Sequence, residues 1–325
     1  MTYLVVGLGA IGGTLAARLS LAGRSVVGVA RGEHGQAVRR DGLLLCTPTG
    51  DHRVRLEVHT SVRDVRPGPD DVVVVATKSQ DSVSVFGELA EVASPHTAVV
   101  CAQNGVANEP AALRWFGCVY GMVVMCPALH LEPGVVAAYS APVVGILDVG
   151  RFPGGEDEVS RGVASDLESA GFSSRSVPDV ARWKYAKLLT NLGNAVEAVC
   201  GPAVRGGPLT ERLQEEGRAV LERHGIGYAS AAEDEARRGD LIQRGDVDGP
   251  RPGGSLWQSV TRRTPTTEVD YLCGEIVRLG RLAGRSAPAN ALLQQLTHDI
   301  TAGRLAVAGT TEEQVLAALD GAPPR

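Results

Sequence analysis

The stretch that most constrains the fold is "YLVVGLGAIGGTLAARLSLAG" at residues 3–23. A short apolar run precedes three glycines spaced G-x-G-x-x-G, and a segment with helical patterning follows them. In a strand–turn–helix unit the first glycine allows a tight turn, the second lets a pyrophosphate approach the backbone, and the third lets helix and strand pack closely. The context between strand and helix makes this common motif specific. We therefore predict a dinucleotide site made by Gly7, Gly9, Ala10, Ile11 and Gly12.

The end of the next strand indicates which dinucleotide is bound. Residues 25–29 are expected to form that strand, and Arg31 follows where an acidic residue usually holds the adenosine ribose. A guanidinium can bind a 2′-phosphate through paired charge-assisted hydrogen bonds, whereas a carboxylate would repel it. The prediction is NADP(H) rather than NAD(H), and the alternative is a solvated surface arginine.

Two further apolar runs, "DDVVVVATKSQ" and "TAVVCAQNGV", are typical of buried parallel strands. The apolar part of the first run is followed by Lys78, and that of the second by Asn104. Ligands of doubly wound sheets lie at the carboxyl ends of the strands, so both residues are candidates for cofactor binding, with a surface charge as the alternative for Lys78. β-rich segments at 118–126, 134–140 and 142–150 are expected to complete the first domain.

The second half has helical patterning. We expect helices over 180–199, 209–224, 230–238, 267–283 and 289–302, and a loop or lid over 239–254. The change falls at Pro178, which gives a domain of residues 1–178 and another of residues 179–325. The predicted fold class is α/β, with an N-terminal Rossmann-type doubly wound sheet and an all-helical C-terminal domain.

The first of these helices carries a polar stripe. At about 100° per residue, Asn191 and Asn194 lie within roughly 40° of Lys187, so an ammonium and two amides share one face. The alternative is a solvated face, which Lys184 on the adjacent arc keeps open. Further on, Ser255 follows a glycine pair, and Glu268 lies in a first helical turn, where an acid is usually a dipole partner.

Composition limits the partners. A net charge of −5 over 325 residues disfavours a nucleic-acid surface. The sequence contains no run of about 18 apolar residues, the length needed to cross a membrane. The six cysteines are scattered without a disulfide framework, which favours reduced thiols and the cytoplasm. The seven histidines show no metal-ligand spacing. We expect a small-molecule substrate and no metal; a homodimer stays open.

Taken in order, the motifs resemble the ketopantoate reductase family: "GLGAIGG", "ARG", "ATK", "QNG", "KLLTN", and "SLWQ" followed by "TEVDY". The resemblance covers nearly the whole chain. It implies an active site in the cleft between a Rossmann domain and a helical domain, with NADPH as the hydride donor. The implied reaction is reduction of 2-dehydropantoate to pantoate, a step of pantothenate and coenzyme A biosynthesis.

The resemblance also implies roles for individual residues. Lys187 would be the general acid that protonates the carbonyl oxygen, while Asn104 and Asn191 would orient the cofactor amide and the substrate. The remaining roles are 2′-phosphate binding by Arg31, a place near the cofactor for Lys78, and substrate binding by Asn194, Ser255 for the carboxylate and Glu268 for the distal hydroxyl.

Three positions depart from the family pattern. Ser259 stands where an aspartate is common, Asn194 falls one position early so that Ala195 takes its usual place, and Trp257 lies near Ser255. Two alternatives therefore stay open. One is an NADPH-dependent reductase of another 2-keto acid or of an imine, or a 6-phosphogluconate-like dehydrogenase, and the other is a non-catalytic NADP(H)-sensing protein.

Overall fold

The computed structural model describes residues 1–245, 247, 253–262 and 267–321. It divides into two compact units, Met1–Lys184 with Ser230–Gly249, and Tyr185–Ala229 with Pro250–Arg325. The chain therefore enters the second unit, returns to the first, and enters the second again. The predicted division at residue 178 is a single cut, whereas the structure assigns residues 230–249 to the first unit.

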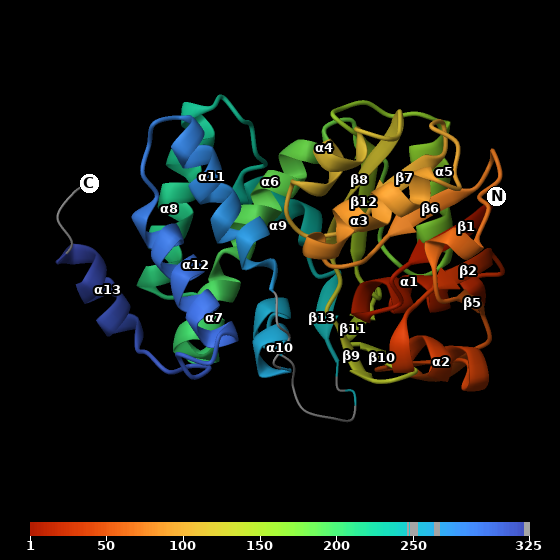
Figure 1. Ribbon diagram of the computed structural model, residues 1–325, viewed down its shortest axis with the longest axis horizontal. Coiled ribbons are helices and arrows are strands. Elements are labelled where there is room, and N and C mark those ends of the chain that lie inside the picture. The colour runs from red at the N-terminus through yellow and green to blue at the C-terminus, as the bar shows by residue number, and fades with distance from the viewer. Residues whose placement is uncertain (246, 248–252, 263–266, 322–325) are drawn as a thin grey trace. The chain divides into compact units, whose positions relative to one another are not determined.

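The first unit is built on a seven-stranded sheet in the order β12-β8-β7-β6-β1-β2-β5 (Figure 1). Its strands are β1 Thr2–Val6, β2 Ser25–Val29, β5 Glu57–His59, β6 Val72–Val75, β7 Ala98–Cys101, β8 Cys118–Met125 and β12 Ile146–Arg151. All pairs are parallel except β12 with β8. The strand order reverses between β1 and β6, and doubly wound sheets bind their ligands at such a reversal.

Both faces of this sheet are buried, which explains the continuous apolar runs. Along β1, Tyr3 and Val5 belong to one core cluster and Leu4 and Val6 to another, as the period of two in a strand requires. The helices of this unit are α1 Ala10–Leu21, α2 Gly32–Asp41, α3 Ser79–Ala90, α4 Asn108–Ala112, α5 Glu158–Ser169 and α9 Ala231–Arg238, with the 3-10 turn η1 Val62–Asp64.

A second, four-stranded sheet packs on α1 and was not foreseen as a separate element. Its order is β4-β3-β10-β9, with β3 Leu43–Thr47, β4 Gly50–Val54, β9 Ala128–Glu132 and β10 Val135–Ala138. The run at 134–140 therefore does not extend the main sheet. A two-stranded sheet joins β11 Ser140–Pro142 to β13 Ile242–Arg244. The segment predicted as a loop over 239–254 thus contains a strand, and its residues 246 and 248–252 lie outside the described residues.

The second unit contains only helices among its described residues. They are α7 Gly193–Cys200, η2 Pro202–Val204, α8 Pro208–Arg223, α10 Ser255–Thr261, η3 Glu268–Tyr271, α11 Cys273–Leu282, α12 Pro288–Thr301 and α13 Glu312–Asp320. Helices α8, α11 and α12 pack on one another (Figure 1). The predicted fold class is confirmed. No helix in the described part of the chain combines the length and apolarity that crossing a bilayer requires.

Helix α6, Val180–Asn191, contains the boundary between the units. The single helix predicted over 180–199 is interrupted at Leu192, and α7 begins at Gly193. Two tightened bonds mark the interruption, from the Leu192 N–H to the Leu189 carbonyl and from the Ala195 N–H to the Leu192 carbonyl. Leu192 itself keeps helical dihedrals, φ −58° and ψ −33°, so the backbone tightens here without leaving the helical conformation.

Candidate active site

The glycine turn between β1 and α1 has the geometry that its motif predicts. Gly7 adopts φ +95°, which favours glycine, and a Cβ on Gly12 would lie 1.9 Å from the Gly7 carbonyl oxygen. At Gly9, in contrast, an added Cβ would meet no atom within 4 Å. Gly7 and Gly12 thus pack the turn tightly, while the backbone at Gly9 lies open at the N-terminus of α1, where helices bind anions.

Arg31 is the N-cap of α2 and lies two residues after the end of β2. Its side chain is exposed. Since β2 is the immediate neighbour of β1 in the sheet, Arg31 and the glycine turn belong to adjacent strand ends. This is the position at which the sequence predicts 2′-phosphate binding.

The ends of β6 and β7 carry buried polar atoms that lack partners. Thr77 Oγ1, Gln103 Oε1 and Asn104 Oδ1 make no hydrogen bond to any described residue. Buried polar atoms are nearly always paired in folded proteins, so unsatisfied ones at a strand edge fit a polar ligand. Lys78, the N-cap of α3, is exposed beside them. The unsatisfied oxygens at this edge therefore fit a dinucleotide whose ring bears an amide, since the amide N–H groups can donate to them.

The loop after β7 is held by a buried ion pair that sequence analysis missed. Lys184 on α6 forms an ion pair with Glu109 on α4 and donates to the Gln103 carbonyl oxygen at 3.0 Å. Their side chains are 4% and 1% exposed, so the suggestion that Lys184 marks a solvated face is wrong. The available signal was Gly121 in the apolar β8, where a Cβ would lie 3.2 Å from the Lys184 side chain.

The candidate substrate residues of α6 and α7 differ in their surroundings. Lys187 is half-buried, whereas Asn191 is 4% exposed and its Nδ2 has no hydrogen-bond acceptor among the described residues. Asn194 is also buried, but its Oδ1 accepts a hydrogen bond from Arg205 Nη2 at 2.7 Å. Asn191 thus retains an N–H for a ligand, while the oxygen of Asn194 is bound within the protein.

Ser255 is the first residue of α10, and a buried acid holds the backbone beside it. Glu197 Oε2 accepts the Gly254 N–H at 2.9 Å and lies 3.4 Å from Arg205 Nη1. Ser259 donates its hydroxyl to the Ser255 carbonyl oxygen at 3.1 Å, so the serine that departs from the family pattern supports α10 internally.

Glu268 begins η3 and is 6% exposed, with residues 263–266 before it outside the described part. The helix predicted over 267–283 is therefore a 3-10 turn followed by α11, with Leu272 between them in a non-helical conformation. Glu268 therefore lies in the short 3-10 turn and not in the longer helix α11.

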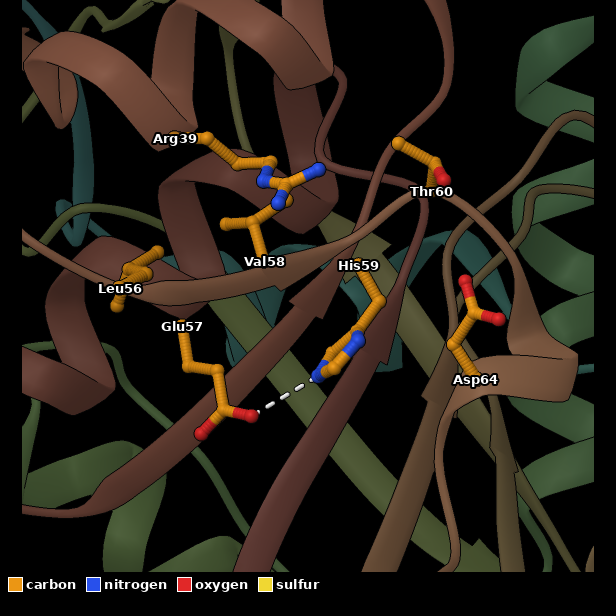
Figure 2. A pocket seen from close by; sticks show the side chains of 7 residues that line it. All are labelled: Arg39, Leu56, Glu57, Val58, His59, Thr60 and Asp64. Carbon is orange, nitrogen blue, oxygen red and sulfur yellow. Dashed lines mark hydrogen bonds and ion pairs between the residues drawn. The ribbon is translucent and has the colours of Figure 1, made fainter.

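A pocket of about 390 Å³ lies against the edge strand β5, which pairs with β2 (Figure 2). Its walls carry the opposite charges of Arg39 and Asp64, and His59 Nε2 lies 2.9 Å from Glu57 Oε1. None of the predicted site residues lines this pocket. It is therefore not the site that the sequence predicts.

Comparison with known proteins decides the family. Residues 3–153 match the family described as ketopantoate reductase PanE/ApbA, and residues 179–301 match its C-terminal domain. The 2-dehydropantoate 2-reductase of Archaeoglobus fulgidus is 30% identical over 310 residues, covering 92% of this chain and 97% of the relative. This chain belongs to the ketopantoate reductase family.

Other ketopantoate reductases agree with this assignment. The 2-dehydropantoate 2-reductase of Pyrococcus horikoshii is 26% identical over 307 residues, covering 91% of this chain and 96% of the relative. A crystal structure of a PanE/ApbA family ketopantoate reductase from Ralstonia eutropha JMP134 superimposes with a TM-score of 0.79 at 25% identity, covering 94% and 99% of the two chains. The predicted family and the predicted class of oxidoreductase are confirmed.

A related fold occurs in a dehydrogenase of another name. The ternary structure of D-mandelate dehydrogenase with NADH and anilino(oxo)acetate has a TM-score of 0.79 at 19% identity and covers 94% of this chain and 99% of that one. At this identity the likeness concerns the fold alone.

Proposed function

We propose that this protein reduces 2-dehydropantoate to pantoate with NADPH, as a step of pantothenate and coenzyme A biosynthesis. The proposal is carried by the match to the ketopantoate reductase family over both domains, together with the unsatisfied polar edge beside the glycine turn. Because the substrate is a small charged acid and all six thiols are free, we further propose action in the cytoplasm. We also propose a homodimer, which the mass of the protein in solution would test.

Residues of the first unit would bind the cofactor. The backbone around Gly7, Gly9, Ala10, Ile11 and Gly12 would hold the pyrophosphate, and Arg31 would bind the 2′-phosphate through charge-assisted hydrogen bonds. Lys78 and Asn104 would lie near the nicotinamide end, with Asn104 Oδ1 accepting from its amide. The bound cofactor supplies a hydride to the 2-keto carbon.

Residues of the second unit would bind and protonate the substrate. The Lys187 ammonium would donate its proton to the carbonyl oxygen as negative charge develops there, which balances the arriving hydride and leaves a neutral Lys187 to be reprotonated by water. Asn191 would orient the keto group through its unpaired N–H. Ser255, Asn194 and Glu268 would contact the rest of the substrate, with Ser255 at the carboxylate and Glu268 at the distal hydroxyl.

The test measures oxidation of NADPH by its absorbance with 2-dehydropantoate and with a panel of other 2-keto acids that includes phenylglyoxylate, using NADH as the cofactor control. We expect 2-dehydropantoate and NADPH to be preferred. Preference for another keto acid would contradict the substrate assignment, and NADPH binding without turnover of any would favour the sensor.

Lys187→Met tests the proton donor. The substitution keeps an unbranched side chain out to the Cε position and removes the ammonium with its charge and proton. We expect kcat to fall by about 10²–10⁴-fold, while the NADPH dissociation constant stays the same. Lys187→Arg, which retains the charge but resists deprotonation, should also lose turnover. Full activity of Lys187→Met would contradict this role.

A further inference from the structure

His34 joins the glycine turn to two other segments of the first unit. It lies in the first turn of α2, three residues after Arg31, and its ring is partly buried. His34 Nε2 lies 2.8 Å from the carbonyl oxygen of Leu8, the central residue of "GLG". Its other nitrogen, Nδ1, lies 3.0 Å from the Gly134 backbone nitrogen and 2.9 Å from His130 Nε2.

These partners fix the protonation of the His34 ring. A carbonyl oxygen only accepts, so Nε2 must carry the hydrogen, and the Gly134 N–H only donates, so Nδ1 must be bare. His34 is therefore neutral in this arrangement, and His130 donates from Nε2. Burial, the larger effect, lowers the pKa of His34, while its bond to Leu8 acts in the opposite direction. Protonation of Nδ1 would place its N–H directly opposite the Gly134 N–H, and neither group could accept the other's hydrogen.

Leu8 is held at its side chain as well. The side chain is 1% exposed and occupies the space beside Gly28 of β2, where a Cβ would lie 2.7 Å from Leu8 Cδ1. With the carbonyl bound to His34, the whole Leu8–Gly9 peptide is fixed. Because a trans peptide is planar, its N–H, which belongs to Gly9, must point away from His34.

We propose that His34 is a positioning residue for the dinucleotide, because it fixes the Leu8 carbonyl and thereby aims the Gly9 N–H at the open side of the turn. This inference rests on the proposed function for the identity of the ligand. His34 acts through the peptide that it holds and need not touch the cofactor. Since the turn serves the pyrophosphate, which NADPH and NADH share, His34 should affect both cofactors alike, whereas Arg31 should affect NADPH alone.

The test compares four variants by isothermal titration with NADPH and with NADH, well below their unfolding temperatures. His34→Phe keeps a ring but removes both nitrogens, and we expect both cofactors to bind about tenfold more weakly. His34→Gln can still donate to Leu8 and should recover part of the loss. His130→Phe removes only the outer donor and should stay within about twofold of the wild type. Arg31→Ala should weaken NADPH binding alone.

Hydrogen exchange of residues 7–12 in the protein without cofactor gives a second measurement. It should rise in His34→Phe and stay near the wild-type level in His130→Phe. Unchanged binding and exchange in a folded His34→Phe would overturn the inference, as would a loss of thermal stability without a change in either. Failure of the wild type to bind NADPH or NADH would instead refute the proposed function, and the exchange data would still decide whether His34 orders the turn.

Discussion

Lys184 and Lys187 lie less than one turn apart on α6, yet their surroundings differ. Lys184 is buried against Glu109 and the Gln103 carbonyl, whereas Lys187 is half-buried in the other unit. Since the carboxylate neutralises Lys184, that lysine is suited to hold the loop after β7 in place. The candidate for proton transfer is the lysine that is not committed to the Glu109 ion pair.

Glu109→Gln should show how much the buried pair contributes to stability. The change leaves the Lys184 ammonium buried without its counter-charge, so we expect the free energy of unfolding to fall by about 3–5 kcal/mol in urea titrations. Glu109→Gln combined with Lys184→Met should recover part of this. Arg63→Ala, which breaks an exposed ion pair with Glu91, is the matched control and should change the free energy of unfolding far less, because water screens exposed charges. Equal effects from the two ion pairs would contradict the prediction.

His34 makes stability depend on pH. Its pKa is lowered in the folded protein from the ordinary value of 6.5, mainly by burial, so below that pH the unfolded chain binds more protons. The His34 contribution should thus be fully present above pH 6.5 and decline as the pH falls toward the folded-state pKa. Unfolding measured between about pH 5 and 7 should have a shallower slope in His34→Phe than in the wild type. Identical slopes would count against the assignment.

Among single residues, the sequence indicated those of a local motif better than those that hold a distant backbone segment in place. The spacing of Gly7 and Gly12 predicted a tight turn, because packing of this kind depends on residues adjacent in the chain. His34 and Glu197 gave no such signal, since their partners lie far away in sequence. The roles of Lys187 and the other candidate residues remain predictions.

Among the elements, α10 depends on a side chain from another helix. Glu197 of α7 accepts the Gly254 N–H and is 3% exposed, with Arg205 as its counter-charge. The two glycines before Ser255 leave no room for larger residues, since a Cβ on Gly253 or Gly254 would lie within 2.7 Å of the Glu197 carboxylate. The start of α10 is thus fixed by contact with Glu197.

Glu197→Gln should therefore loosen α10. The variant loses the charge that pairs with Arg205 and weakens the bond to Gly254, so we expect a loss of about 1–3 kcal/mol in the free energy of unfolding. If Ser255 binds the substrate carboxylate, KM for the keto acid should rise more than kcat falls. Ser259→Ala, which removes a bond within α10 itself, is the control and should change KM less. An unaltered KM in Glu197→Gln would show that substrate binding by Ser255 does not depend on Glu197.

The elements that sequence predicted well were the long periodic ones. The apolar parallel strands β6 and β7 and the helices α8 and α12 follow from their patterns, because each buries residues at a regular period. The short strand β4, Gly50–Val54, is mostly exposed, so alternation of apolar residues could not predict it. The tightened turn at Leu192 was equally invisible, because it lies within a continuous helical pattern.

For the whole molecule, the return of residues 230–249 to the first unit matters most. Arg237 on α9 forms two hydrogen bonds to Asp148 of β12, at 2.7 and 2.6 Å, and both side chains are 3% exposed. A sequence boundary placed where composition changes cannot reveal such a return, since it depends on a pair 89 residues apart. The first unit is therefore complete only when this segment is in place.

Arg237→Met should test this dependence in the full chain. It leaves Asp148 buried without its charge partner, and we expect the free energy of unfolding to fall by about 3–5 kcal/mol. Hydrogen exchange should increase in β12 and α9 together. Asp148→Asn combined with Arg237→Met removes both charges and should be the more stable of the two variants. Exchange that rises in α9 alone would show that the sheet does not need the pair.

The same pair has a consequence for synthesis on the ribosome. The last strand of the main sheet leaves the exit tunnel well before Arg237 does, and at about 5–20 residues per second the 89-residue interval lasts roughly 5–20 s. Throughout that time Asp148 lacks its Arg237 counter-charge, although residues 173–177 can already pair with the outer edge of β12. The order of the chain thus imposes a delay during which the newborn first unit holds a carboxylate without its charge partner and lacks the stability of the complete unit.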